Sequence, residues 1–282
     1  MEESDPTYSG SNQGLQRRWE FTNSGDEVEM ESILMTDLAF QEKLIPNGIR
    51  LGLKLYPQSK DVVLMAADEP LAYDYRITDI ILRVCKVTVS DEIIQSQNEV
   101  MLENDVIIPY QKSVMRSYQI PVNSFSYNVR DMHTGAIPLR MYIAMVRSES
   151  ISGGCKLNQY NYKSFDVNYI QLLVNGIPMP GAAFQPDFAN KKYLREYNTL
   201  FSEVTGGNNI SREDYGGGYF IIKFDIDPWS SDNYASPAAA GQASLSLRFK
   251  PQLPYPVTLL CYSVFEAELR IDGGRNIELV DL

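Results

Sequence analysis

The segment from residue 257 to residue 271 constrains the fold more than any other part of the chain. Its apolar side chains fall on positions of one parity: Val257, Leu259, Cys261, Phe265, Ala267, Leu269 and Ile271. Successive side chains of a β-strand point to opposite faces of a sheet, so this alternation predicts one long strand. One face of that strand is expected to be buried against a second layer.

Other segments also have the alternation or composition of strands. Leu245, Leu247 and Phe249 alternate with polar side chains, and residues 75–89 form a long strand-like run that stops at Ser90. Four more runs are bounded by clusters of Gly, Pro, Asn or Ser, at residues 114–122, 139–146, 165–174 and 219–226. We expect a strand at each of these places.

A turn signal and a proline-rich stretch follow the run at 165–174. Asn175-Gly176 is the dipeptide most suited to a tight two-residue hairpin turn. Pro178, Pro180 and Pro186 come soon after it. We interpret this stretch as a rigid excursion that leads to a helix.

Two short helices are expected in the connections. Ser90 is a suitable N-cap, with two acidic residues in the first turn, for a helix that ends near Glu103. Asn190 can cap a second helix, whose apolar residues form one stripe: Tyr193, Leu194, Tyr197, Leu200 and Phe201. Packing of that stripe against the core is the favoured interpretation.

These elements predict an all-β fold. Roughly eight strands after residue 75 and two short helices fit an antiparallel sandwich better than alternating βαβ units. The long connections indicate a jelly-roll or Greek-key topology. We expect three regions: a flexible polar leader at 1–28, a hairpin and linker at 29–74, and the jelly-roll domain at 75–282. The hairpin is expected from runs at 33–40 and 49–56, separated by Pro46-Asn47-Gly48.

Charge and cysteine usage limit the partners and the compartment. The formal charge of −11 and the lack of Lys and Arg clusters argue against direct nucleic-acid binding. Three scattered cysteines are typical of free thiols in a reducing compartment. No secretory signal and no apolar run of about 20 residues are visible. We expect a protein that is made inside the cell, is not secreted and has no membrane span.

The chain has a poor inventory for catalysis. Its one histidine, His133, lies in a polar, turn-rich segment, which favours a loop or surface position. Triads and the metal centres of jelly-roll enzymes need more histidines than this. Asp225, Asp227 and Asp232 lack the glycine and glutamate of a calcium loop and are interpreted as solvated strand-end carboxylates. We therefore predict no enzyme, no catalytic residue, no metal site and no cofactor.

Aromatic residues on the connections are the remaining functional signal. Tyrosine occurs 18 times, and tyrosine is favoured at protein interfaces because its ring buries area while its hydroxyl stays hydrogen-bonded. An aromatic-lined glycan site is the alternative that composition leaves open. The candidates for interface contact or loop packing are Tyr160, Tyr162, Phe184, Pro186, Tyr193 and Tyr197.

Four ordered blocks of the sequence resemble a known family. They are "DLAFQEKLIPNGIRLGLKL", "FDVNYIQLLVNGIPMPGAAFQPDFANKKYLREYNTLFSE", "NNISREDYGGGYFIIKFDIDP" and "ASLSLRFKPQLPYPVTLLCYSVFEAELRID". In order and spacing they closely resemble the hexon-like major capsid proteins of Polinton (Maverick) elements and adintoviruses, including copies resident in animal genomes. The resemblance extends from about residue 29 to the C-terminus.

The resemblance implies a structural role in a virion. Members of that family are double jelly-roll subunits that trimerise into pseudo-hexagonal capsomers and tile an icosahedral shell. It implies that this chain assembles with itself, with penton or minor capsid proteins as further partners. The loops after Asn175-Gly176 would contact neighbouring subunits. A carbohydrate-binding or receptor-binding single jelly roll, such as a penton-like or fibre protein, is the alternative function.

The sequence departs from the family at its N-terminal side. By resemblance, residues 33–56 are similar to the closing hairpin of a first barrel, and residues from about 75 form the second. The leader is too short to supply the rest of a first barrel. A truncated gene model or decayed genomic copy, a natural split product and a one-barrel protein are the three explanations. A lone second barrel would expose the face meant for its sister, which predicts apolar exposure or self-association.

Overall fold

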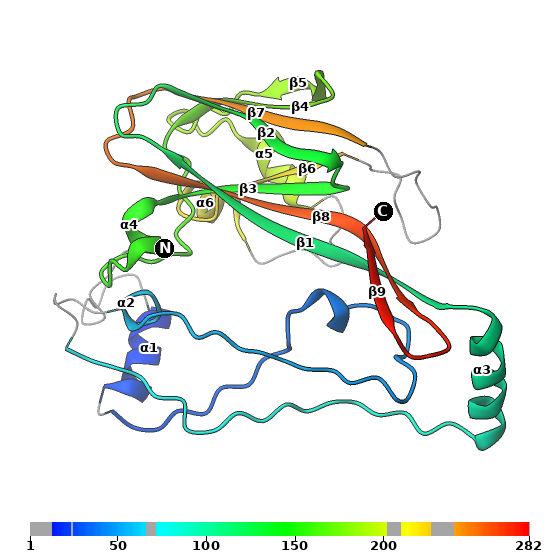
Figure 1. Ribbon diagram of the computed structural model, residues 1–282. Helices are drawn as coiled ribbons and strands as arrows, with labels where there is room; N and C mark the ends of the chain where they lie inside the picture. Colours follow the sequence, from blue (N-terminus) through cyan, green and yellow to red (C-terminus); the bar gives the residue numbers. More distant parts are fainter. Residues whose placement is uncertain (1–12, 24, 66–71, 202–209, 227–239, 282) are drawn as a thin grey trace. The chain divides into compact units, whose positions relative to one another are not determined.

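The computed structural model describes residues 13–23, 25–65, 72–201, 210–226 and 240–281 (Figure 1). The chain divides into two compact units. Unit 1 comprises residues 1–32, 58–74 and 113–264, and unit 2 comprises 33–57, 75–112 and 265–282. Each unit is described by itself below.

Unit 1 is built from two antiparallel sheets. The first has the strand order β1-β8-β3-β6, and the second has the order β2-β7-β4-β5. The strands run β1 (Val106–Ile120), β2 (Ser126–Ala136), β3 (Arg140–Arg147), β4 (Val167–Val174), β5 (Ile177–Phe184), β6 (Ile221–Asp225), β7 (Ala240–Phe249) and β8 (Val257–Ile271). In Figure 1 the two sheets face each other as stacked layers.

This strand order is that of a jelly roll. The chain passes repeatedly from one sheet to the other, and of the eight strands of the sandwich the first pairs with the eighth, β1 with β8. Two interleaved Greek keys give this arrangement. The prediction of an all-β, antiparallel jelly-roll sandwich is therefore confirmed.

The sandwich closes around one apolar core. Strand β7 buries Ala243, Leu245, Leu247 and Phe249, which alternate with more exposed residues. Strand β8 pairs with β3 from Val257↔Arg147 to Val264↔Arg140, and within this stretch it buries Val257, Leu259 and Cys261. The inward faces of both sheets meet in this core, as the alternation in the sequence predicted.

The Asn175-Gly176 turn forms as predicted, but the segment after it is a strand. Asn175 and Gly176 both have positive φ, 53° and 78°, which a primed two-residue turn requires. Residues Ile177–Phe184 then pair with β4 as strand β5. The prediction of a rigid excursion that leads directly to a helix is wrong for residues 177–184, which form a strand because β5 lies at the edge of its sheet, where prolines are tolerated.

Unit 2 has a smaller core around one helix. Helix α3 (Asp91–Glu103) starts after Ser90, as predicted, although the Ser90 side chain makes no cap hydrogen bond. Strand β9 (Ile277–Asp281) pairs with residues 267–271 of β8. A second apolar cluster contains Met101, Ile108, Leu269 and Ile271, against which Leu38, Ile45 and Ile49 pack.

Two predicted strand regions in unit 2 are not assigned as strands. Residues 33–56 contain one short 3-10 helix, η1 (Asp37–Ala39), and the predicted hairpin is not formed by these described residues. Residues 75–89 are likewise not assigned as a strand. The pattern of these segments favours strands, but a strand is stabilised only by a neighbour that accepts and donates its main-chain hydrogen bonds.

The remaining helices are short. They are α1 (Gln13–Thr22), α2 (Lys60–Val63), α4 (Ser148–Ser152), α5 (Leu194–Asn198), η2 (Thr199–Phe201) and α6 (Arg212–Gly216). Helix α1 falls inside the predicted flexible leader, where its residues favour a helix. Within the described residues, no helix is long and apolar enough to cross a membrane.

Candidate interface on the loops of the jelly roll

The long connections of unit 1 are fixed by a cluster of aromatic rings. Phe188 stacks on Tyr193 with ring centroids 5.0 Å apart and meets Phe220 edge-on at 5.3 Å. Tyr215 lies 5.5 Å from both Phe220 and Tyr197. Offset and edge-to-face pairs of this kind add stability beyond the area that they bury. The loops between β5 and β6 therefore have their own small core.

The tyrosine hydroxyls of this cluster hold the loop backbone. Tyr193 Oη donates to the Arg212 carbonyl at 3.1 Å, and Tyr197 Oη donates to the Ile210 carbonyl at 2.9 Å. Tyr215, which is fully buried, donates to the Ile221 carbonyl at 3.1 Å. Burial raises the pKa of Tyr215 well above its ordinary value, so its hydroxyl stays a donor. The hydroxyls of these tyrosines link the segments around helix α5, helix α6 and strand β6 by hydrogen bonds.

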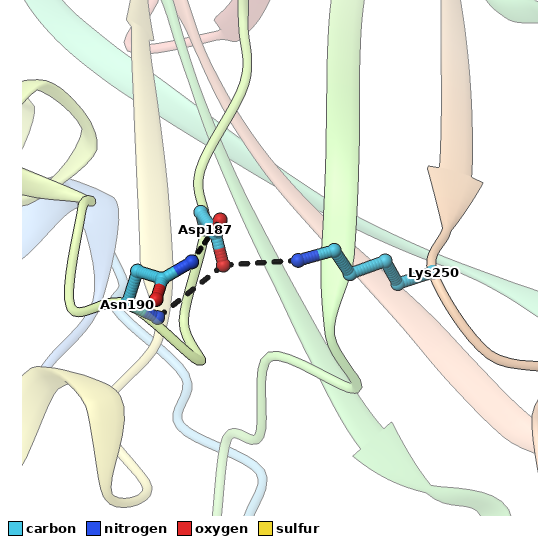
Figure 2. Close-up of polar contacts among 3 residues, drawn as sticks. All are labelled: Asp187, Asn190 and Lys250. Carbon is cyan, nitrogen blue, oxygen red and sulfur yellow. Dashed lines mark hydrogen bonds and ion pairs between the residues drawn. The ribbon is translucent and has the colours of Figure 1, made fainter.

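The start of the α5 segment is also held by charged groups (Figure 2). Asp187 accepts hydrogen bonds from Asn190 Nδ2 at 2.8 Å and from Lys250 Nζ at 3.0 Å. These two contacts, the Asn190 side chain first, lower the pKa of Asp187 to about 2. The sequence predicted that Asn190 is the N-cap of α5, and this prediction is wrong. Tyr193 occupies the cap position, and Asn190 closes a turn three residues earlier.

The six predicted interface residues separate into exposed and buried positions. Tyr160 is 58% exposed on the loop before β4. Tyr162 and Tyr197 are half-buried, and the main chain of Tyr162 bridges to Tyr219. The other three, Phe184, Pro186 and Tyr193, are buried. In this structure these three side chains pack inward, and Tyr160 is the one of the six whose side chain is exposed.

Phe184 shows how a predicted contact residue can instead serve the interior. Its ring meets Phe224 edge-on at 5.5 Å, and the Arg195 guanidinium lies 4.6 Å from the ring centroid. Arg195 also donates to the carbonyls of Ala182 and Ala183 at 2.8 and 2.9 Å. A sequence rich in tyrosine and proline does not say which side of a segment faces inward.

The prediction that His133 lies on a loop or at the surface is wrong. His133 is on strand β2 and is 3% exposed. Its Nε2 lies 2.7 Å from Ser263 Oγ on β8, in the other sheet. Ser263 Oγ is in turn 3.3 Å from Cys261 Sγ. The burial of His133 was not predictable from the sequence, because the register of β2 against β7 shifts between Val129 and His133. This shift breaks the alternation of inward and outward side chains along β2.

His133 and Ser263 are hydrogen-bonded to each other in the interior of the sandwich. Burial lowers the pKa of His133 to about 4, with a smaller effect from the Arg116 guanidinium. Burial raises the pKa of Cys261 to about 11. Both groups are neutral near pH 7, and neither opens onto a described cleft. This chemistry suits a structural hydrogen bond between the sheets.

Asp225 also differs from its prediction. It is not a solvated strand-end carboxylate: its Oδ2 lies 3.1 Å from Nζ of Lys223, which is buried, and its Oδ1 is buried. Asp227 and Asp232 lie outside the described residues. Within the described part of the chain, no group of three His, Cys, Asp or Glu side chains is placed to hold a metal ion.

Comparison with known proteins gives one curated relative and several similar structures. No family model matches the chain. An uncharacterized protein of Caenorhabditis elegans is 26% identical over 262 residues, which is 88% of this chain and 62% of that protein. The chain thus spans less than two thirds of the length of this relative.

Three of the similar solved structures come from viruses. The structure of the Sputnik virophage is 13% identical, with a TM-score of 0.43 over 63% of this chain and 39% of that chain. The PBCV-1 virus capsid is 9% identical, with a TM-score of 0.39 over 66% and 54%. The mavirus major capsid protein is 8% identical, with a TM-score of 0.38 over 63% and 41%.

Proposed function

We propose that this chain is a structural capsid protein of a virus or a virus-derived transposon of the Polinton and adintovirus type. It would build trimeric capsomers of an icosahedral shell and act through subunit packing, without catalysis. The observation that carries the proposal is the strand order β1-β8-β3-β6 over β2-β7-β4-β5. Jelly rolls of this order serve as capsid domains, lectins and cupins.

The chemistry of the core favours the capsid among these three. A cupin site needs several imidazoles that open into the barrel, and the only imidazole in this chain is buried against Ser263. The interior is filled by side chains of both sheets. A sandwich with a filled core and with loops held by buried hydrogen bonds is suited to a capsid subunit, whose function depends on its shape.

Surface composition supports assembly with other subunits. Residues 50–59 are exposed without interruption, and among them Leu51, Leu53, Leu55 and Tyr56 are large and apolar. Soluble monomers rarely expose so many large apolar side chains together. In the proposed virion, this surface is covered by neighbouring subunits, by penton or minor capsid proteins, or by further barrel structure.

The test is the mass and shape of the purified chain, measured by light scattering and negative-stain imaging. We expect trimers or larger particles. The Tyr160→Ser variant should weaken the trimer by removing the exposed loop ring, whereas the matched control Tyr73→Ser, also an exposed tyrosine of unit 1, should leave it unchanged. A monomer that binds a glycan panel would instead support the receptor-binding alternative.

A further inference from the structure

Helix α3 of unit 2 carries an open groove of about 470 Å³ along one side. Its apolar lining comes from Ile94, Met101 and Leu102 of the helix, and the turn after β8 lines it through Gly273 and Arg275. A Cβ atom on Gly273 would lie 2.6 Å from the Met101 carbonyl oxygen, so this turn packs directly on the helix. The groove is therefore a fixed feature of unit 2.

The helix gives the groove an acidic rim. Asp91 and Glu99 line it, and α3 also carries Glu92 and Glu103 but no Lys or Arg. All four carboxylates are exposed, and in the described part of the chain none of them is in an ion pair. The one cation of the lining, Arg275, is hydrogen-bonded to side chains of the same helix. An apolar groove with an excess of carboxylates fits a partner that offers ammonium groups on aliphatic stems.

The chain itself presents such groups on an ordered turn. Residues 187–192 of unit 1 form this turn, in which the main chains of Asp187 and Lys192 bond to each other in both directions at 2.8 Å. The Asp187 side chain holds the same turn through the contacts described above (Figure 2). Lys191 and Lys192 are both exposed, and the sequence has no other pair of adjacent lysines. Because the backbone is already ordered, docking of the two lysines requires little further ordering.

The surroundings of the turn leave it cationic. The carboxylate of Asp187 is paired with Lys250. The guanidinium of Arg195, on the helix that follows, donates to main-chain carbonyls, so no carboxylate cancels its charge. Arg212 also reaches the turn, but two carboxylates of its own helix α6 offset it. In a chain with a formal charge of −11, this turn and the rim of α3 are complementary surfaces.

We propose that the Lys191-Lys192 turn of one copy docks in the α3 groove of a second copy. The lysine stems cover the apolar lining, and the ammonium groups meet the carboxylates of Asp91 and Glu99. Since the two surfaces differ, the contact is heterologous, and it closes into a ring or continues into an extended assembly. This inference rests on the proposed function, because it names the surfaces through which the subunits pack.

Cross-linking of the full chain tests the contact directly. Isotope-labelled and unlabelled chains are mixed and treated with a carbodiimide, which joins an amine to a carboxylate in contact with it as an amide, with loss of water. Mass spectrometry should find amides between Lys191 or Lys192 of one isotopic form and Asp91 or Glu99 of the other. Links from these lysines that occur only within one isotopic form, or no links to α3, would overturn the proposal.

Charge reversal tests the energetics. Lys191→Glu with Lys192→Glu places like charges together and should raise the concentration for half-assembly by roughly tenfold, measured by light scattering over a dilution series. Asp91→Lys with Glu99→Lys should do the same. A chain with all four substitutions reverses both surfaces and should associate like the parent chain.

The matched control is Arg130→Glu with Lys156→Glu, which reverses two other exposed cations of unit 1. It has the same net charge as the lysine variant and should associate like the parent chain. If the lysine variant instead loses retention on a heparin column while its self-association is unchanged, the turn binds a polyanion and the proposal is wrong.

The outcomes separate this contact from the capsid proposal. Trimers or particles that are insensitive to the reversals but sensitive to Tyr160→Ser would remove the contact and leave the capsid proposal intact. Charge-sensitive association with the expected cross-links, but without trimers or particles, would do the reverse. A parent chain that stays monomeric at high concentration would overturn both.

Discussion

Lowering the pH should destabilise the jelly roll through one residue. His133 is buried on β2, and its folded-state pKa is about 4. An unfolded histidine has a pKa of about 6.5. Because the folded pKa is depressed, the stabilising contribution is complete above pH 6.5 and is lost as the pH falls toward 4.

The size of the effect follows from the two pKa values. At pH 5, protonation of the histidine in the unfolded chain raises the equilibrium constant for unfolding by a factor of about thirty, because the histidine of the folded chain is hardly protonated at this pH. The free energy of unfolding should therefore drop by about 2 kcal/mol between pH 7.5 and pH 5. His133 is the single histidine of the chain, so comparison with a variant that lacks it separates its contribution from that of the carboxylates, including Glu196, whose pKa is raised by burial.

The assay is urea unfolding followed by circular dichroism at pH 7.5, 6.5, 5.5 and 5.0. The control is His133→Gln, which keeps an amide group near Ser263 Oγ and cannot titrate. Its stability should fall by about 2 kcal/mol less than that of the parent chain over this range. The histidine ring protons, observed by NMR, should titrate near pH 4 in the folded protein. A histidine that titrates near 6.5, or parent and variant curves with the same slope, would refute the reasoning.

Three further outcomes are expected. Asp187→Asn removes the ion pair with Lys250 and should loosen the turn before α5, seen as faster amide exchange there; in the parent, the same loosening should begin only as the pH falls below about 4, because the pKa of Asp187 is depressed. Gly176→Ala should cost about 1 kcal/mol in urea unfolding, because Gly176 has a φ of 78°; no loss would argue against the primed turn. Leu245→Ala, in the core of β7, should cost about 2–5 kcal/mol, whereas a loss within 0.5 kcal/mol would contradict the assigned strand face.

The sequence predicted those strands whose alternation is regular. Strands β7 and β8 each bury one parity of apolar residues over most of their length, and both were found with the correct face. Strand β2 was missed because its register shift moves the inward positions to Met132 and His133. Strand β5 was missed because its prolines are tolerated only at an edge, and a single sequence does not show which strand is the edge.

The candidate site was predictable only as a class of residue. Tyrosines and prolines were expected on the loops, but Pro178 and Pro180 lie in strand β5, and of the loop tyrosines Tyr193 faces inward and Tyr160 outward. That difference depends on which helix and which strand pack beneath each loop, and such contacts are long-range. For the segments 33–56 and 75–89, strands were predicted and none is assigned. Their side chains favour strands, but no neighbouring strand is assigned to them. Local preference and available partners are separate conditions for a strand.

The order of the strands also governs how the chain can fold during synthesis. Strand β7 lies between β2 and β4, and strand β8 lies between β1 and β3, so the central strands of both sheets come last in the jelly roll. A growing chain on the ribosome can form the β4–β5 hairpin, but it must hold β1 and β2 without their partners until residues 240–271 have emerged. Pairing over such long sequence separations is slow and exposes apolar strands to aggregation. Translation that stops shortly before residue 257 should therefore yield a chain that misfolds almost as completely as one that stops much earlier.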